Sequence, residues 1–395
     1  MLGITKYSSI RTMPNQYNIL EWEKRLYSVY HLQIREMNHL HEGAISFEAS
    51  NGIFYNPKMK MNRDICVAAV KSLGIKDYLD AFSASGIRGL RVAKEAGVAK
   101  VTLNDVSPRA HECIQYNIKL NGLNNCIAFC CNANALMYMR HFQAVDLDPF
   151  GSPSQFMSAA ARSALSYLMI TATDTAPLCG AHFKSGKRMY LARPIKTDYH
   201  KEMGARILLG LAARELARHD KSMTPLLTYA IDHYVRTYLG VRRGARLADA
   251  CLDNLGHVEH CYACGSFKIL MEPRTNGKCV RCSSDTVLSG PLWLGNIHDQ
   301  NFLNQCLKYS TDNISVVRLL EICASEDEVP FYYDHHSICR RLGITPAKVD
   351  RVIDLLRESG WKASRTHFSG LGIKTDAPIN DLDAAVMISS ASNNF

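Results

Sequence analysis

The stretch 78–105, YLDAFSASGIRGLRVAKEAGVAKVTLND, predicts a strand, a helix and a second strand in succession. Tyr78–Phe82 and Val101–Asn104 are apolar runs of strand length, whereas Ile87–Ala96 between them has the apolar spacing of a helix. Two strands joined through a helix are the repeating unit of parallel α/β sheets. This stretch therefore sets the expected fold class.

The same alternation continues towards the C-terminus. Further strands are expected at 127–130, 144–147 and 167–173, and further helices at 108–120 and 155–166. Strands that alternate with helices favour a parallel sheet with helices on both faces. The chain has 395 residues, which at roughly 150 residues per domain leaves room for two or three domains.

The sequence changes character after Gly256. Four cysteines fall in a loop-rich segment that ends near Pro291, and helical spacing returns between Asn313 and Gly360, followed by Trp361 and a segment expected to be extended. Three short amphipathic helices suggest a winged-helix-like domain. The predicted organisation is an N-terminal extension at 1–36, an α/β domain at 37–255, a ribbon at 256–292 and a winged-helix-like α+β domain at 293–395.

Composition narrows the class of protein. Apolar residues make up 47% of the chain and charged residues 21%, which is ordinary globular usage, and the length excludes a small disulfide-stapled scaffold. The N-terminus lacks the apolar core of a secretory signal, and no apolar run is long enough to cross a bilayer. We therefore expect a cytoplasmic protein with no membrane partner, and no obligate protein partner is evident.

The positive charge is concentrated in one part of the chain. The formal net charge is +9, and the segment from Ala181 to Ala250 holds 14 Lys/Arg against 6 Asp/Glu. Such a patch indicates a polyanionic partner. Within it, 236–246 interleaves arginines with Tyr238, and Arg242, Arg243 and Arg246 are expected to neutralise nucleic-acid phosphates.

The turn after the first strand is a candidate nucleotide site. Asp80 opens the sequence DAFSASG, and Gly86 permits a tight turn and the close approach of a ligand. One glycine does not make G-x-G-x-x-G, so a dinucleotide is not the first interpretation. Asp105, at the end of the second strand, is placed to accept both ribose hydroxyl hydrogens of an adenosyl group. Asn132 and Ala133 follow the third strand and are candidates for the adenine edge, although an asparagine there is as often only a turn residue.

The end of the fourth strand carries the sequence DLDPFGSP at 146–153. An acid, a proline and an aromatic at a strand end resemble the Asp/Asn-Pro-Pro-Tyr/Phe motif of amino-methyltransferases. A base amine is a poor nucleophile, so hydrogen-bond acceptors must hold its hydrogens and an aromatic face must hold the base. Asp148 is the candidate acceptor and base, Pro149 supplies a carbonyl, and Phe150 supplies the aromatic face.

Longer strings resemble one family, the archaeal and eukaryotic tRNA (guanine-26-N2) dimethyltransferases. The resemblance runs from about Phe47 to Asp376 and rests on FYNP at 54–57, NRD at 62–64, SGIRGLR at 85–91, DLDPFGSP at 146–153, TATD at 171–174, APLCG at 176–180 and KTDAP at 374–378. It implies a Rossmann-like class I methyltransferase that uses S-adenosylmethionine to methylate the exocyclic amine of guanosine 26 in tRNA.

The resemblance also assigns residues. It implies that Arg63 and Arg88 contact the cofactor and that Phe54 and Phe150 flank the target base. The chain departs from the family at Asn132, where the family tends to have an acid, and residues 1–36 have no identified counterpart. Two alternatives stay open: an amino-methyltransferase that acts on another base, and an inactive zinc-containing RNA-binding protein.

Cys261, Cys264, Cys279 and Cys282 form a C-x2-C-x14-C-x2-C pattern. This spacing is typical of a zinc ribbon, in which four thiolates complete a tetrahedron around a structural Zn2+ and leave no open position for catalysis. The other cysteines are expected to be buried thiols without a role.

Overall fold

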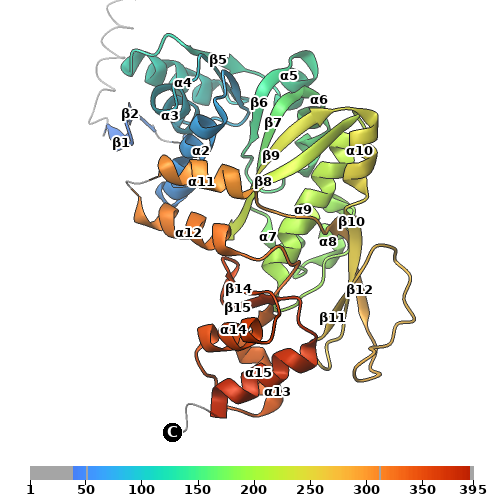
Figure 1. The fold of residues 1–395 in the computed structure, drawn as a ribbon. Coiled ribbons are helices and arrows are strands. Elements are labelled where there is room, and N and C mark those ends of the chain that lie inside the picture. The colour runs from blue at the N-terminus through green and yellow to red at the C-terminus, as the bar shows by residue number, and fades with distance from the viewer. Residues whose placement is uncertain (1–38, 50–51, 311–312, 392–395) are drawn as a thin grey trace, which may run out of the picture.

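The computed structural model describes residues 39–49, 52–310 and 313–391, so the extension expected at 1–36 lies outside the described residues. The centre of the fold is a seven-stranded sheet in the order β5-β4-β3-β6-β7-β9-β8 (Figure 1). Its strands are β3 Asp77–Asp80, β4 Lys100–Asp105, β5 Cys126–Cys130, β6 Phe142–Leu147, β7 Ala164–Ala172, β8 Lys221–Ile231 and β9 Tyr234–Arg243.

The sheet is mixed rather than parallel throughout. Strands β5, β4, β3, β6 and β7 are parallel, as the alternating pattern predicts. Strand β9 pairs antiparallel with β7, and β8 pairs antiparallel with β9. The expectation of a parallel sheet is wrong at this edge because the two residues between β8 and β9, Asp232 and His233, form a hairpin turn with no helix to carry the chain back.

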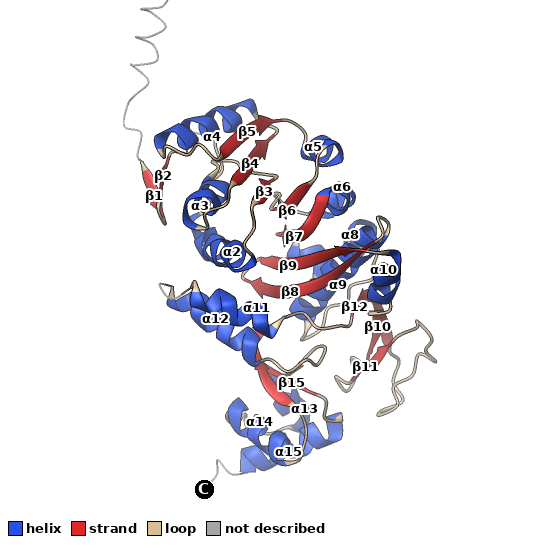
Figure 2. Cartoon of the chain, turned by 45° about the horizontal axis from the view of Figure 1, so that its top comes forward, coloured by secondary structure: helices blue, strands red, loops and turns tan. Residues whose placement is uncertain are grey.

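Helices cover both faces of the sheet (Figure 2). Neighbouring strand residues alternate between two apolar cores: Tyr78 belongs to one core and Leu79 to the other, and both are fully buried. The first core holds α2 Lys60–Leu73, α3 Ile87–Glu95, α4 Pro108–Leu120, α11 Gln300–Lys308 and α12 Ile314–Ser325. The second holds α5 Ala133–Met139, α6 Met157–Ser163 and α9 His200–Ala217.

Short elements complete this part of the chain. They are the hairpin β1 Leu40–Glu42 and β2 Ile45–Phe47, the 3-10 turns η1 Pro57–Met59 and η2 Ser154–Phe156, and the helices α7 Thr175–Leu178, α8 Phe183–Tyr190 and α10 Ala245–Leu252. Among the described helices, none is long and apolar enough to cross a membrane.

A second, three-stranded antiparallel sheet follows in the order β11-β10-β12. Its strands are β10 Leu255–His260, β11 Phe267–Leu270 and β12 Val287–Trp293. Cys261 and Cys264 lie between β10 and β11, and Cys279 and Cys282 lie between β11 and β12. The four cysteines therefore sit on two loops at one end of this small sheet.

The C-terminal part has its own apolar core. It contains β13 Tyr333–Asp334, α13 His335–Leu342, α14 Val349–Glu358, β14 Ala363–Thr366, β15 Ser369–Thr375 and α15 Ile379–Ala391, with the strands in the order β13-β15-β14. The extended segment expected after Trp361 is found in strands β14 and β15, but the expectation is wrong from Ile379 on, where α15 forms. This helix forms because Leu382, Ala385 and Val386 have helical spacing and pack into this core.

Buried charges join the C-terminal part to the sheet. The Lys374 ammonium of β15 lies 3.1 Å from Glu202 of α9 and 3.2 Å from Glu326, and all three side chains are at most 2% exposed. Arg206 pairs with Glu202 at 2.9 Å. Since an unpaired buried charge is costly, these pairs hold the two parts in a fixed relation.

Candidate active site

A cavity of about 930 Å³ lies at the carboxyl ends of β3, β4 and β6. Parallel sheets bind ligands at this edge. The walls come from four distant parts of the chain: the segment before α2, the turn after β3, the loop after β6 and the β8–β9 turn. The side chains that line it include Phe54, Arg63, Asp80, Arg88, Asp105, Asp148, Pro149, Phe150, Thr173, Asp232 and His233.

The turn after β3 forms the floor of the cavity. Gly86 begins α3 with a φ of 83°, and a Cβ added there would lie 3.3 Å from the Leu103 side chain. Ala84 also has a positive φ, of 48°. This left-handed backbone favours glycine, so the predicted need for Gly86 agrees with the structure. Gly86 itself shapes the turn and is not among the lining residues.

Two acids flank this turn. Asp105 accepts hydrogen bonds from the Ala84 amide at 3.0 Å and from the Ser107 amide at 2.9 Å. Asp80 accepts one from the Gly89 amide at 3.1 Å, while its Oδ1 is buried and has no partner among the described residues. Burial raises the pKa of Asp80 to about 7. An unpartnered carboxylate oxygen in a cavity wall is suited to a cationic or hydroxyl donor of a ligand.

Arg88 reaches from the same turn to the loop after β6. Its guanidinium donates hydrogen bonds to Asn62 at 2.8 Å and to Asp148. These two bonds hold Arg88 between α2 and the DPF sequence at 148–150. Asp146 lies 3.8 Å away on the other side. Arg88 thus contacts both acids of the DLD sequence, so it orients Asp148 in addition to lining the cavity.

A buried ion pair supports Arg88 from below. Asp146 accepts hydrogen bonds from Arg236 at 2.6 and 2.7 Å and from the Tyr78 hydroxyl at 2.6 Å. Burial alone would raise the pKa of Asp146, but Arg236 and Arg88 outweigh burial and hold that pKa at about 2. Asp146 is therefore ionised, and Arg236 is structural. Its expected place in an exposed basic patch is wrong, as is that of the fully buried Tyr238.

Two aromatic side chains stand at the mouth of the cavity. Phe54 is 60% exposed and Phe150 is 93% exposed. Their ring centroids lie 6.3 Å apart at an interplanar angle of 75°. Two exposed aromatic rings this close together at a cavity mouth offer apolar faces to a flat ligand, so the pair marks a place where such a ligand can enter.

Arg63 lines the cavity but is already paired. It donates to both Glu42 oxygens, at 2.7 and 2.5 Å, and to the Asn56 carbonyl at 3.1 Å. Its guanidinium also lies 5.2 Å from the Tyr55 ring centroid. These contacts fix the segment that carries Phe54 against α2.

The structure does not bring Asn132 and Ala133 into the cavity lining. Asn132 caps α5 by accepting hydrogen bonds from the amides of Asn134 and Ala135, at 2.9 and 3.2 Å. It follows β5 at the same edge of the sheet, and its role at an adenine ring stays a prediction.

Sequence reasoning missed the β8–β9 turn. Asp232, His233 and Tyr234 line the cavity although they lie more than 80 residues after the loop at 148–150. Two alternating apolar runs separated by two polar residues were the available signal for this hairpin. Asn62 was missed as well, because nothing in its neighbourhood predicts the hydrogen bond to Arg88.

The four predicted metal ligands do come together. All four Sγ atoms lie within 4.8 Å of one another, with Cys261 and Cys282 at 3.5 Å and Cys264 and Cys279 at 3.6 Å. Thiolates bound to one zinc at about 2.3 Å in a tetrahedron lie roughly 3.8 Å apart. The donor set and its spacing therefore fit a four-thiolate metal site.

A second group with metal-ligand atoms lies between the sheet and the C-terminal part: His298, Cys323, Glu326 and His367. Here Glu326 already accepts a hydrogen bond from His367 at 2.5 Å and pairs with the Lys374 ammonium at 3.2 Å. A cation beside that ammonium would be repelled. We therefore interpret this group as part of the buried ionic contact between the two parts.

Known proteins resemble this chain over most of its length. A family model described as N2,N2-dimethylguanosine tRNA methyltransferase matches residues 34–387. A curated tRNA (guanine(26)-N(2))-dimethyltransferase of Methanosarcina mazei is 46% identical over 355 residues, which are 85% of this chain and 91% of the relative. The chain belongs to this methyltransferase family. The family resemblance carried by the sequence strings is confirmed.

A solved structure and a further curated relative agree with this membership. Trm1 from Pyrococcus horikoshii, solved in complex with S-adenosyl-L-methionine, superposes with a TM-score of 0.81 at 37% identity and covers 88% of this chain and 99% of its own. A curated relative from Natronomonas pharaonis with the same enzyme description is 41% identical over 346 residues, 86% of this chain and 94% of the relative. The expected Rossmann-like class I methyltransferase core is thereby confirmed, with the mixed sheet described above.

Proposed function

We propose that this protein transfers methyl groups from S-adenosylmethionine to the exocyclic N2 amine of guanosine 26 in tRNA, giving N2-methylguanosine and then N2,N2-dimethylguanosine. The observation that carries the proposal is the position of Asp148, which is held by Arg88 in a cavity whose mouth is flanked by Phe54 and Phe150. Family membership supplies the choice of base and of position.

The cavity residues fit S-adenosylmethionine. Asp105 at the end of β4 suits the ribose hydroxyls, and the unpartnered Oδ1 of Asp80 suits the ammonium group of the methionine part. Arg63 and Arg88 suit its carboxylate, and Gly86 keeps the backbone of the turn close to the ligand. Bound there, this cofactor supplies an electrophilic methyl group.

The residues around Asp148 bind and orient the base that accepts the methyl group. Guanosine 26 must leave its stack to reach the cavity, and Phe54 and Phe150 hold the exposed base by stacking. A base between two rings needs about 3.4 Å on either side, slightly more than the present 6.3 Å between centroids, so one ring must turn or move as the base enters. Asp148 and the Pro149 carbonyl accept the amine hydrogens, which directs the N2 lone pair towards the methyl group.

Methylation makes N2 positively charged, so a proton must leave. Asp148 accepts that proton and releases it to water before the second transfer. Its carboxylate is oriented for this by Arg88, which in turn is placed by Asn62 and Asp146. The cavity of about 930 Å³ has room for the methylated base to stay for a second round.

The remaining parts support tRNA binding in this proposal. The four cysteines hold a structural Zn2+, with no position open for catalysis. In the C-terminal part, the order helix, short strand, two helices and a hairpin is that of a winged helix, which commonly places a helix and a hairpin against nucleic acid. We assign both modules to holding the tRNA body.

Neither alternative accounts for the site as well. A methyltransferase for another base would share the DPF sequence, but the family match extends over residues 34–387 and includes the Phe54 segment. An inactive RNA-binding protein would have no need to keep Asp105, Arg88 and Asp148 around one cavity.

The proposal is tested by mass spectrometry of nucleosides. An unmodified tRNA transcript is incubated with the protein and S-adenosylmethionine beside a transcript in which guanosine 26 is replaced by adenosine. Dimethylguanosine in the first transcript and none in the second is the expected result. Methylated nucleosides in both transcripts, or in neither, would contradict the proposal.

A further inference from the structure

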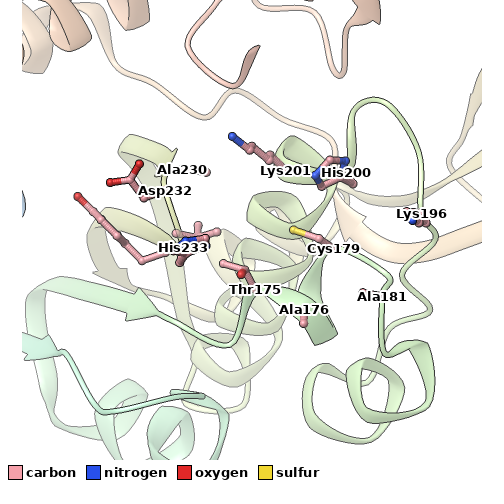
Figure 3. Close-up of a pocket in the computed structure, with 12 residues that line it drawn as sticks. Thr175, Ala176, Cys179, Ala181, Lys196, His200, Lys201, Ala230, Asp232 and His233 are labelled. Atoms are coloured by element: carbon pink, nitrogen blue, oxygen red, sulfur yellow. The ribbon is translucent and has the colours of Figure 1, made fainter. Parts of the chain in front are cut away.

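A second hollow lies next to the catalytic cavity (Figure 3). Its volume is about 270 Å³, and it shares the residues Asp232, His233 and Tyr234 with the larger cavity. The opposite wall carries Lys196, His200 and Lys201, which lead into α9. The β8–β9 turn lines both hollows, so a polymer with one unit in the larger cavity has the smaller hollow directly beside it.

The segment that supplies Ala181, Lys196 and Lys201 to this hollow is strongly cationic. Between Ala181 and Lys201 the chain has six Lys/Arg residues and a single acid, Asp198. We define the α8–α9 cationic surface as Lys184, Lys187, Arg188, Lys196 and Lys201. Lys201 is half-buried, and the other four are exposed. Within the parts of the chain that the structure describes, none of these five side chains forms an ion pair or hydrogen bond.

Unpaired cations beside a cavity for nucleic acid favour phosphate binding. The exposed Asp232, in the shared wall, is the one acid among the residues that line the smaller hollow. The charge of the α8–α9 cationic surface is therefore left for an anionic partner.

The other basic cluster lies at the wrong edge of the sheet for this role. Strand β9 starts at the cavity, where Val235 pairs with Ala172 at the carboxyl end of β7, and Gly240 already pairs with Tyr167 near its amino end. Arg242 and Arg243 follow, about 26 Å from the turn at roughly 3.3 Å per residue. Arg246 lies further on, in α10.

We propose that the α8–α9 cationic surface binds the backbone phosphates of the tRNA strand next to the target nucleotide, with Lys187, Lys196 and Lys201 as contacts. This inference rests on the proposed function, since it takes tRNA as the polymer that occupies the cavity. Under this proposal, the basic residues of the segment Ala181–Ala250 that bind RNA are those of the α8–α9 cationic surface. Arg242, Arg243 and Arg246 do not contact the strand next to the target nucleotide.

Two triple variants with equal loss of charge test the inference. The first is Lys187→Gln, Lys196→Gln and Lys201→Gln, and the second is Arg242→Gln, Arg243→Gln and Arg246→Gln. Affinity for a fluorescent tRNA transcript is measured by anisotropy at several KCl concentrations. Each lost phosphate contact lowers the slope of log affinity against log salt by about 0.7 to 0.9, so the first variant is expected to lose about 2 to 3 from that slope. Its affinity at low salt should fall at least tenfold.

The second variant is expected to bind within about twofold of the wild type and to keep its salt slope. Equal weakening of both variants, or weakening of the second alone, would overturn the proposal, because net charge or the far edge would then explain binding. Melting temperature and S-adenosylmethionine affinity by calorimetry show that both variants are folded. The binding assay does not depend on methylation. If the two variants differ in tRNA affinity as expected but the wild type makes no dimethylguanosine, the proposed reaction is refuted and the proposed phosphate-binding surface is supported.

Discussion

Arg236 and Asp146 lie 90 residues apart in the chain and form a doubly hydrogen-bonded ion pair in which both side chains are fully buried. One comes from the antiparallel hairpin and the other from the parallel part of the sheet. Asp146 also faces Arg88, which contacts Asp148. The hairpin thus extends the sheet at one edge and supplies the positive charge that allows Asp146 to be buried under the site.

Replacing Arg236 by methionine should destabilise the protein by about 3 to 5 kcal/mol, because Asp146 would be left as an uncompensated buried charge. Chemical denaturation of the two proteins measures the difference. Arg243→Gln, at the exposed end of the same strand, is the matched control and should change the free energy of unfolding by less than about 0.5 kcal/mol. Equal stability of Arg236→Met and the wild type would refute the structural role of the pair.

The raised pKa of Asp80 predicts that the free energy of unfolding of the protein depends on pH. Its pKa of about 7 in the folded protein exceeds the value near 4 of an unfolded chain, so the folded state binds the proton more tightly. This contribution is fully present below about pH 4 and is lost as pH rises to about 7. Asp80→Asn, which stays neutral and can still accept from Gly89, should therefore be more stable than the ligand-free wild type at pH 8 by a few kcal/mol.

Thermal or chemical unfolding of Asp80→Asn and wild type at pH 5 and pH 8 checks this. The gap in stability should widen with pH. A gap that is the same at both pH values would show that Asp80 is ionised throughout this range in the folded protein.

The ribbon should depend on its metal. Removal of zinc with a chelator, or Cys279→Ser, should abolish the one bound zinc ion per protein. Either change should also lower the melting temperature of the ribbon, because few apolar side chains besides the cysteines pack around the two loops. Elemental analysis and calorimetry measure the two effects. Cys130→Ser, an exposed cysteine outside the cluster, is the control. Full zinc content in Cys279→Ser would rule out the four-thiolate site.

Phe150→Ala should reduce methylation without reducing stability. The side chain is 93% exposed, so its removal costs little in folding, while loss of a stacking face is worth about 1 to 3 kcal/mol of base binding, or roughly 5- to 150-fold in kcat/KM. Steady-state kinetics and a melting curve on the same preparation measure both. Leu165→Ala, an exposed apolar residue at the start of β7, should leave kcat/KM unchanged. A Phe150→Ala protein with wild-type kcat/KM would remove Phe150 from the site.

Much of the fold follows from local sequence. The parallel strands and helices α3, α4 and α6 follow from short apolar runs alternating with helical spacing, and α4 matches its expected bounds, whereas α5 was not expected. The β8–β9 hairpin was missed although its two apolar runs were a local signal, because its strands also carry charged residues whose burial depends on partners elsewhere. From the sequence alone, an arginine such as Arg236 is expected at the surface. Its burial is explained only by the ion pair with Asp146, which the fold brings next to it.

The site divides in the same way. Asp80, Asp105 and Asp148 were predictable because each lies at, or directly after, the end of a strand in the parallel part of the sheet, and such ends meet at one edge. Phe54 was not, since an aromatic residue is more often buried, and only the family resemblance singled it out. Asp232 and His233 reach the cavity through a turn whose position depends on antiparallel pairing between β7 and β9.

The most direct test of the central claim is single-turnover methylation of a tRNA transcript by Asp148→Asn, with protein in excess over RNA. Asparagine can still accept from Arg88 but cannot take the proton from N2. The account predicts a rate at least 100-fold below that of the wild type, while affinities for tRNA and S-adenosylmethionine change by no more than a few fold. Methylation of guanosine 26 at the wild-type rate would contradict it.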